Sequence, residues 1–233
     1  ANLQFFGTAA VNQASPLIAR YQRYYQQFYQ QPVQSAPPQD PAGIAMLLPL
    51  HRYQDATDFC KSLKKKAGNF WRDAERARRG GFMLRPFVMA NHTPDLLSIR
   101  RSRKLRAFGP VLDAFTLKIQ DLGGAPSQLQ QWQAPPCHEH WDLYFGVFRA
   151  QPGYLQGTVE TGEQLLAYAR LHRIGNTLRY AELMGHAEFQ QQGVMSMLHL
   201  DLIRLLLTRD EAWLNGIDYL TYGALEQGSD GLI

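Results

Sequence analysis

Apolar residues in this chain occur both in short runs and in stripes with helical spacing, a pattern that predicts a mixture of strands and helices. The segments with strand composition are 44–50, 82–89, 141–148, 165–173, 177–184 and 218–224. The segments with helical spacing are 17–29, 55–79, 96–106, 113–122 and 194–209. Strands and helices in this order indicate an α/β or α+β fold, in which helices flank a mixed sheet.

The most regular pattern lies between residues 158 and 225. Two strands flank the turn Ile174-Gly175-Asn176, whose glycine and asparagine accept positive φ, so residues 165–184 are expected to form a β-hairpin. The helix that begins at Val194 has few polar positions, which places it in the core. The strand 218–224 then closes this unit.

An aromatic stripe near the N-terminus predicts an amphipathic helix over residues 17–29, which begins after Ser15-Pro16 and ends before Pro32. The stripe consists of Leu17, Ile18, Tyr21, Tyr24, Tyr25, Phe28 and Tyr29. Such a helix packs on its own domain, or it binds a protein partner, a second copy of the chain or a lipid surface. Its other side carries glutamines rather than lysines, which disfavours lipid. A proline-rich linker follows, so we expect two parts, 1–43 and a folded domain 44–233.

The composition is that of a globular protein, since hydrophobic residues make up 45% of the 233 residues. No apolar run reaches the ~18 residues that a membrane-spanning helix needs, and the N-terminus lacks the features of a secretory signal. The two cysteines, Cys60 and Cys137, are expected to be free thiols, as in a reducing compartment. We therefore expect a cytoplasmic protein. The stretch Gly228-Ser229-Asp230-Gly231 close to Ile233 indicates that the natural chain continues.

The net charge of +4 is modest, but the basic residues are clustered. The clusters comprise Lys61, Lys64, Lys65 and Lys66, then Arg72, Arg76, Arg78 and Arg79, and then Arg100, Arg101, Arg103, Lys104 and Arg106. Clustered positive charge attracts phosphate-bearing partners such as nucleic acid or a phosphorylated cofactor. The other interpretation is a solvated helix face whose charge is balanced by nearby acidic residues.

A candidate donor-binding loop lies where the strand 177–184 leads through a glycine turn into the helix that begins at Val194. Free backbone N–H groups and the positive end of the helix dipole converge there, which suits a phosphate, although many helices begin after a glycine for structural reasons alone. The segment Gln190-Gln191-Gln192-Gly193-Val194-Met195 is similar to the pyrophosphate-binding loop of GNAT acyltransferases. That loop has Arg or Gln, two residues, Gly, one residue, then Gly or Ala. Met195 replaces the last small residue and crowds a diphosphate, which leaves coenzyme A open as the donor.

The order of elements from 158 to 225 resembles the C-terminal, GNAT-fold half of Fem-type ligases and related aminoacyl-transferring proteins. The resemblance implies a GNAT-like mixed sheet and acyl transfer to an amine, with an acyl-CoA or an aminoacyl-tRNA as the donor and no metal. The residues that would hold the donor are Gln190, Gln192, Gly193 and Val194. The basic helices near 61–79 and 100–106 would hold the phosphorylated donor or tRNA.

Acyl transfer to an amine needs a group that accepts the ammonium proton, and often a group that protonates the leaving group. Glu182, on the strand before the loop, and His186, just beyond that strand, are candidates for the first role, and Tyr222 on the last strand is a candidate for the second. Each has a structural alternative. Glu182 faces solvent in the hairpin, His186 caps the turn at Gly185, and Tyr222 packs in the sheet.

Three other features have weaker functional interpretations. The segment Cys137-His138-Glu139-His140 contains metal-ligand residue types, but the sequence has no second Cys/His pair to complete a zinc site. The segment Asn91-His92-Thr93-Pro94-Asp95 is expected to cap a helix, and it is also placed to line a pocket. His199, on an apolar helix, is expected to be a hydrogen-bonded core histidine.

The leading hypothesis is a GNAT-fold N-acyltransferase or aminoacyltransferase. The alternative is a catalytically inactive GNAT-like scaffold that docks into a larger assembly through the helix 17–29. Replacing Gly193 by a bulky residue is expected to abolish donor binding and to leave the fold intact.

Overall fold

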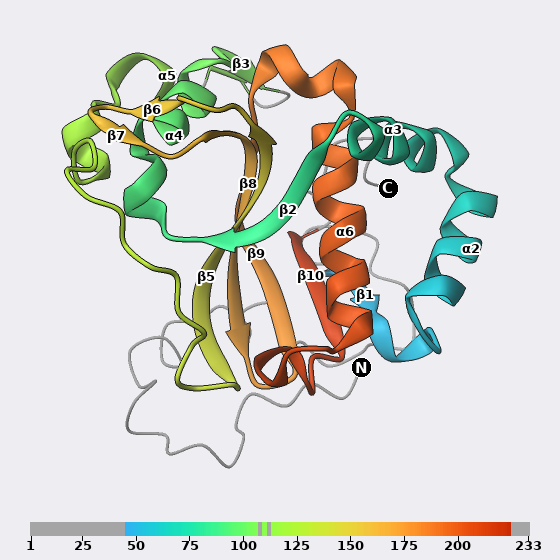
Figure 1. Ribbon diagram of the computed structural model, residues 1–233. Coiled ribbons are helices and arrows are strands. Elements are labelled where there is room, and N and C mark those ends of the chain that lie inside the picture. Colours follow the sequence, from blue (N-terminus) through green and yellow to red (C-terminus); the bar gives the residue numbers. More distant parts are fainter. Residues whose placement is uncertain (1–44, 107–108, 111–112, 225–233) are drawn as a thin grey trace.

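A computed structural model describes residues 45–106, 109–110 and 113–224 (Figure 1). The predicted helix 17–29, the linker that follows it and the boundary at residue 43 lie outside these ranges. The donor loop, the three catalytic candidates and most of the basic residues lie inside them.

The centre of the fold is a six-stranded mixed sheet with the strand order β1-β10-β9-β8-β5-β2. Its strands are β1 (Ala45–Pro49), β2 (Phe82–Phe87), β5 (His140–Ala150), β8 (Glu163–Ile174), β9 (Thr177–Gly185) and β10 (Tyr219–Ala224). The β9–β10 pair is parallel, and the other four neighbouring pairs are antiparallel. The predicted mixed sheet with flanking helices is therefore confirmed. Pro86 lies on the edge strand β2, as expected for a residue without a backbone N–H.

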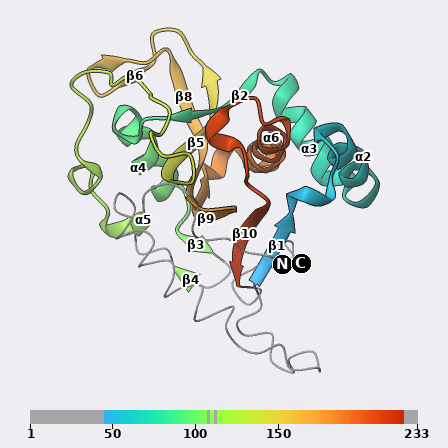
Figure 2. The same ribbon diagram turned by 90° about the horizontal axis from the view of Figure 1, so that it is seen from below.

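Helices cover both faces of the sheet and create two apolar clusters (Figure 2). On one face α2 (Ala56–Lys66) and α3 (Gly68–Arg79) pack against α6 (Val194–Thr208). Nine residues of α6 are buried, which confirms that it is a core helix. On the other face α4 (Thr93–Arg101) packs on β8 and β9. Below, these are called the α6 face and the α4 face.

Several predicted boundaries are wrong, and tertiary packing is the reason. The predicted helix 55–79 is two helices, because Ala67 leaves the helical region with φ −137° and ψ 58°. The break lets Phe59 on α2 and Ala77 on α3 both become buried against the core. The predicted helix 96–106 is α4 and ends at Arg101, and the predicted helix 113–122 contains only the short α5 (Asp113–Thr116) and a 3-10 turn (Ile119–Leu122).

Two small two-stranded sheets were not predicted from the sequence. They are β3 (Leu105–Arg106) with β4 (Gly109–Pro110), and β6 (Leu155–Gln156) with β7 (Val159–Glu160). Strands of two residues carry no detectable alternation, so only the surrounding structure defines them. Among the described residues, no helix has both the length and the hydropathy that crossing a membrane requires.

Candidate functional site

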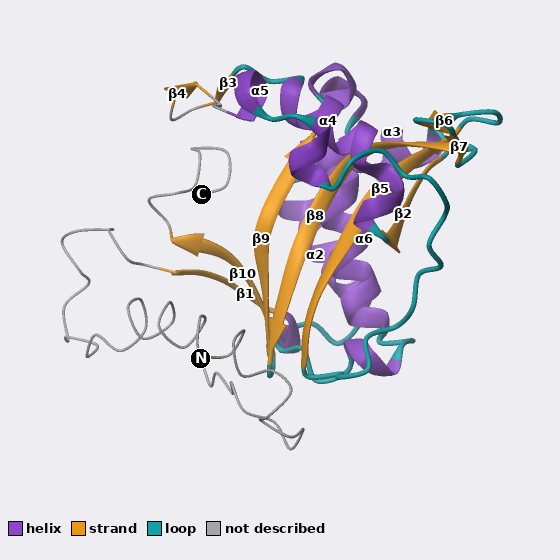
Figure 3. Cartoon of the chain, turned by 90° about the vertical axis from the view of Figure 1, so that its left-hand side faces the viewer, coloured by secondary structure: helices purple, strands orange, loops and turns teal. Residues whose placement is uncertain are grey.

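The parallel strands β9 and β10 separate partway along their length and form a fork (Figure 3). They pair at only three positions, the last of which joins Arg179 to Thr221. Beyond this point β9 continues to Gly185 beside β8, and β10 continues to Ala224 beside β1. The backbone edge of β9 that faces the fork therefore has no strand partner beyond Arg179 within the described residues.

A β-bulge in β9 explains the separation. Arg170 on β8 pairs with Glu182, but the next residue, Leu171, pairs with Tyr180. Ala181 is therefore an extra residue on β9. Because a bulge bends its strand and increases the local twist, β9 turns away from β10 immediately after the paired segment.

The bulge also changes which side chains of β9 face each side of the sheet. Leu178 and Tyr180, which precede the bulge, belong to the cluster on the α6 face, whereas Met184 packs in the cluster on the α4 face. Glu182 also faces α4, since its carboxylate contacts Arg100 of that helix. Residues 180 and 182 would share one face in a regular strand, so the extra residue reverses the alternation.

On the α6 face, two tyrosines and one histidine lie at the base of the fork. The Nδ1 atom of His199 lies 3.0 Å from the hydroxyl oxygen of Tyr180 and 3.3 Å from that of Tyr222. Burial lowers the pKa of His199 to about 4 and raises the pKa of Tyr222 to about 12, so both groups are neutral near pH 7. His199 is a hydrogen-bonded core histidine, as predicted. Tyr222 packs in the sheet, with its hydroxyl held next to His199.

On the α4 face, Glu182 is part of an ionic network rather than a solvent-facing residue. Its Oε2 atom lies 2.6 Å from a guanidinium nitrogen of Arg100, and its Oε1 atom lies 3.6 Å from Arg170. The hydroxyl of Tyr168 donates a hydrogen bond to Oε2 at 3.2 Å. The contact with Arg100 is a charge-assisted hydrogen bond, which is stronger than a bond between neutral groups. From the sequence, Arg100 was only part of a basic cluster. Its ion pair with Glu182, 82 positions further along the chain, was not predicted.

His186 acts as a cap and also lines a cavity. Its Nδ1 atom accepts a hydrogen bond from the backbone N–H of Glu188 at 3.3 Å, which confirms the predicted capping role. Its Nε2 atom lies 3.2 Å from the hydroxyl oxygen of Ser98 on α4. Together with Arg101, these residues line an open cavity of about 620 Å³ between α4 and the start of the donor loop. Ser98 was not among the predicted site residues.

The predicted donor loop forms a 3-10 helix (Ala187–Gln192) that leads into α6. Gln190 hydrogen-bonds to Arg103, whereas the side chain of Gln192 is exposed. Val194 is fully buried as the first residue of α6. Some residues of the loop therefore pack in the protein and others face solvent. The loop still leads into the N-terminus of a 15-residue helix.

Gly193 has a packing role that the sequence did not reveal. Its φ is +81°, a left-handed conformation that favours glycine. A Cβ atom at this position would lie 2.1 Å from the backbone oxygen of Asp73, because α3 passes directly beside the start of α6. The expectation that a bulky residue at Gly193 would leave the fold intact is therefore wrong.

Met195 is accommodated by a second glycine. A Cβ atom at Gly185 would lie 2.5 Å from the sulfur of Met195, so the methionine side chain lies over the end of β9. The larger residue in the loop is thus matched by the absence of a side chain at Gly185.

The three catalytic candidates do not form one cluster. Glu182 and His186 contact α4, whereas Tyr222 contacts His199 of α6 on the opposite face. Within the described residues, no strand pairs with the edge of β9 that faces β10 beyond Arg179, so this is where the sheet is interrupted between the two faces. A role for all three residues in one reaction therefore requires a ligand that passes through the fork.

Two of the four basic residues of α3 are paired with acidic residues. Arg76 pairs with Asp73, and Arg78 pairs with both Glu75 and Asp201. This pairing agrees with the interpretation of α3 as a solvated helix face whose positive charge is balanced by nearby acidic residues. On α2, Lys61 and Lys64 instead line a cavity of about 280 Å³ together with Arg204, Trp71 and Cys60.

Neither cysteine forms a disulfide, as predicted. Burial raises the pKa of the Cys60 thiol, so this group stays protonated near pH 7. The Sγ atom of Cys137 lies 3.7 Å from Nδ1 of His140. Within the described ranges, no group of three or more His, Cys, Asp or Glu side chains is arranged to hold a metal ion.

Comparison with family models, with curated proteins and with solved structures finds no match to this chain. The function of this protein is therefore inferred from its own geometry.

Proposed function

We propose that this protein transfers an acyl or aminoacyl group to an amine, with the donor bound in the fork between β9 and β10. The observation that carries the proposal is the fork itself, which a bulge opens beside the N-terminus of α6. An extended donor arm that contains amide groups would pair with the free edge of β9. Its phosphate would lie at the first N–H groups of α6, where the helix dipole is positive.

The donor loop suits a phosphorylated donor, but it does not distinguish acyl-CoA from aminoacyl-tRNA. Arg103 is held at the loop by its hydrogen bond to Gln190, and Arg101 lines the neighbouring cavity, so positive charge is present on this side. Lys61 and Lys64 on α2 provide a second basic region that would contact a larger donor such as tRNA.

The amine acceptor would bind in the cavity between α4 and the donor loop, next to His186. Its nitrogen attacks the acyl carbon, and the bond from that carbon to the donor's sulfur or oxygen breaks. The ammonium proton passes through water to Glu182 or His186. A leaving alkoxide takes its proton from Tyr222, whose hydroxyl is still protonated because burial raises its pKa to about 12. A leaving thiolate is a weaker base than the phenolate of Tyr222 and departs as the anion.

The reaction is tested by incubating the chain with a series of acyl-CoA thioesters, or with aminoacyl-tRNA, and a set of primary amines. Tyr222→Phe removes one hydroxyl and should lower the turnover number by about 100-fold with little change in donor affinity. Tyr53→Phe is the matched control, because Tyr53 packs on Phe59 of α2, away from the fork. If no donor binds the unmodified chain, the proposal fails.

Met195 offers a way to distinguish the two donors. Replacing Met195 by Ala gives the loop the small residue that a diphosphate requires, and Gly185→Ala in the same chain refills the space over β9. The double variant should bind coenzyme A more tightly than the unmodified chain if acyl-CoA is the donor. If tRNA is the donor, the double variant and the unmodified chain should have the same affinity for aminoacyl-tRNA, because the acceptor end of tRNA has no diphosphate.

A second candidate function is that of a catalytically inactive scaffold. The observation that favours it is that Glu182 is already paired with two arginines and that the hydroxyl of Tyr222 is already close to His199. A scaffold should bind neither acyl-CoA nor aminoacyl-tRNA, but it should co-purify with a partner. Deletion of residues 1–40 should abolish that co-purification, whereas an enzyme should keep its donor binding.

A further inference from the structure

A third cavity lies at the β2 edge of the sheet. It has a volume of about 350 Å³, is partly open to solvent, and lies between the end of β2, the 3-10 helix Met89–His92 before α4, residues 129–132 and the start of β8. Strands β5 and β8 lie between β2 and β9 in the sheet. None of its lining residues belongs to the donor loop or to the cavity next to His186, so the site is separate from the proposed transfer reaction.

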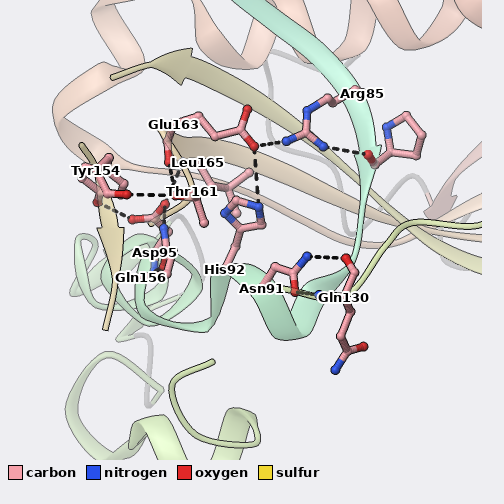
Figure 4. A network of polar contacts seen from close by, with 11 residues as sticks. Arg85, Asn91, His92, Asp95, Gln130, Tyr154, Gln156, Thr161, Glu163 and Leu165 are labelled. Atoms are coloured by element: carbon pink, nitrogen blue, oxygen red, sulfur yellow. Dashed lines mark hydrogen bonds and ion pairs between the residues drawn. The ribbon is translucent and has the colours of Figure 1, made fainter. Parts of the chain in front are cut away.

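Opposite charges line this cavity side by side (Figure 4). Arg85 of β2 forms an ion pair with Oε1 of Glu163, the first residue of β8. The guanidinium of Arg85 also lies over the ring of Phe148, with 4.2 Å between its central carbon and the ring centroid. The side chain of Glu163 is 18% exposed and that of Arg85 is 41% exposed, so both charges remain accessible from the cavity.

The ion pair leaves hydrogen-bonding capacity unused on both partners. Oε2 of Glu163 has no hydrogen-bond partner among the described residues, because Arg85 and His92 both approach Oε1. Arg85 has five N–H donors, and its hydrogen bonds in this part of the chain go to Glu163 and to the backbone oxygen of Pro86. A ligand can therefore bind both charged groups without breaking their pair.

His92 adds a buried polar group without adding charge. Its side chain is 4% exposed, and its Nε2 atom lies 3.8 Å from Oε1 of Glu163. Burial and the nearby Arg85 lower the pKa of His92 to about 4, so the ring is neutral near pH 7. Its Nδ1 atom and the indole nitrogen of Trp132, another lining residue, are buried without a partner among the described residues. A buried polar atom without a partner is uncommon and costs stability, which points to a bound ligand or water.

The wall of the cavity is fixed in place by Asn91. Its side-chain nitrogen donates to the backbone oxygen of Gln130 at 2.8 Å, and its side-chain oxygen accepts from the backbone N–H of Gln130 at 2.9 Å. The predicted capping role of this segment is wrong, because no side chain caps the N-terminus of α4. Asn91 instead joins the 3-10 helix to the loop 129–132 and preserves the shape of the cavity.

From these features we infer that the cavity at Arg85, Glu163 and His92 binds a small zwitterion of the α-amino acid class. The carboxylate of the ligand accepts hydrogen bonds from Arg85, and its ammonium group donates to Oε2 of Glu163. Its side chain lies against Phe87 and Trp132, which also line the cavity. A cavity near the lower limit of about 300 Å³ for ligand pockets favours one free amino acid over a larger molecule.

The test is isothermal titration calorimetry of the full chain with the standard free amino acids. The tightest ligand is then compared with its N-acetyl derivative, which has no ammonium group, and with its amide, which has no carboxylate. Each change removes one charged hydrogen bond and should weaken binding by about 10-fold or more. If no amino acid binds, or if both derivatives bind as well as the parent amino acid, the inference is wrong.

Two substitutions assign each end of the ligand. Arg85→Gln should weaken binding of the amino acid by about 10-fold or more and leave binding of its amide unchanged. Glu163→Gln should also weaken binding of the amino acid by about 10-fold or more, but it should leave binding of the N-acetyl derivative unchanged. Arg52→Gln, at an exposed position outside the cavity and outside the basic clusters, should change nothing. Equal affinity of the substituted and unmodified proteins would overturn the inference. The comparison of ligand derivatives on the unmodified chain decides the question even if a variant fails to fold. The assay contains no acyl donor, so its outcome is independent of the transfer reaction.

Discussion

Replacing Gly193 by Ala tests the packing of α3 against the start of α6. The substitution places a Cβ atom 2.1 Å from the backbone oxygen of Asp73, and backbone cannot rotate away as a flexible side chain can. It also imposes a non-glycine residue on a φ of +81°. The left-handed conformation alone costs about 1–2 kcal/mol, and forcing extra volume into a packed site costs about 1–3 kcal/mol more. We expect a total loss of about 2–5 kcal/mol in the free energy of unfolding.

Gly153→Ala is the matched control, because Gly153 has a φ of +77° and an added Cβ atom there would meet no described atom within 4 Å. It carries the conformational cost without the collision and should lose only about 1–2 kcal/mol. Urea unfolding of both variants, followed by tryptophan fluorescence and far-UV circular dichroism, gives the two free energies. Equal losses for the two variants would refute the claim that α3 constrains Gly193. In that case, glycine at 193 would be explained by its φ or by the donor.

Two further predictions concern buried polar groups. Asp95 accepts hydrogen bonds from the hydroxyl of Tyr154 at 2.6 Å and from the backbone N–H of Leu165 at 2.7 Å, which joins α4 to β8. Asp95→Asn replaces one acceptor oxygen by a donor and should lower the free energy of unfolding, measured in urea, by about 1–3 kcal/mol. An unchanged urea midpoint would show that the hydrogen-bond network rearranges without cost. Burial lowers the pKa of His199 to about 4 from 6.5, so the unfolded chain binds a proton before the folded one does as the pH falls. The free energy of unfolding is therefore unaffected by this group above pH 6.5 and falls between pH 6.5 and 4, by about 3 kcal/mol at most. His199→Phe should reduce that loss by a similar amount, and identical stability curves against pH for variant and unmodified chain would contradict the assignment.

The sequence by itself determined the hairpin, the core helix and the closing strand. The turn at Gly175-Asn176 and the flanking apolar residues are local signals, and the structure places β8 and β9 within two residues of the predicted limits. The nearly uniform apolar character of residues 194–208 identified α6 as a core helix for the same reason. Local backbone preferences and side-chain periodicity are present in a short window, so they can be detected without a partner segment.

The tertiary structure decided where the chemical groups lie. The extra residue at Ala181 is a property of the pairing between β8 and β9, so no pattern in β9 alone reveals it. That bulge opens the fork and places Glu182 and Tyr222 on opposite faces of the sheet. The carbonyl of Asp73 beside Gly193 and the ion pair of Arg85 with Glu163 join residues far apart in the chain. Such contacts depend on how helices and strands pack, and local sequence patterns carry no information about that packing.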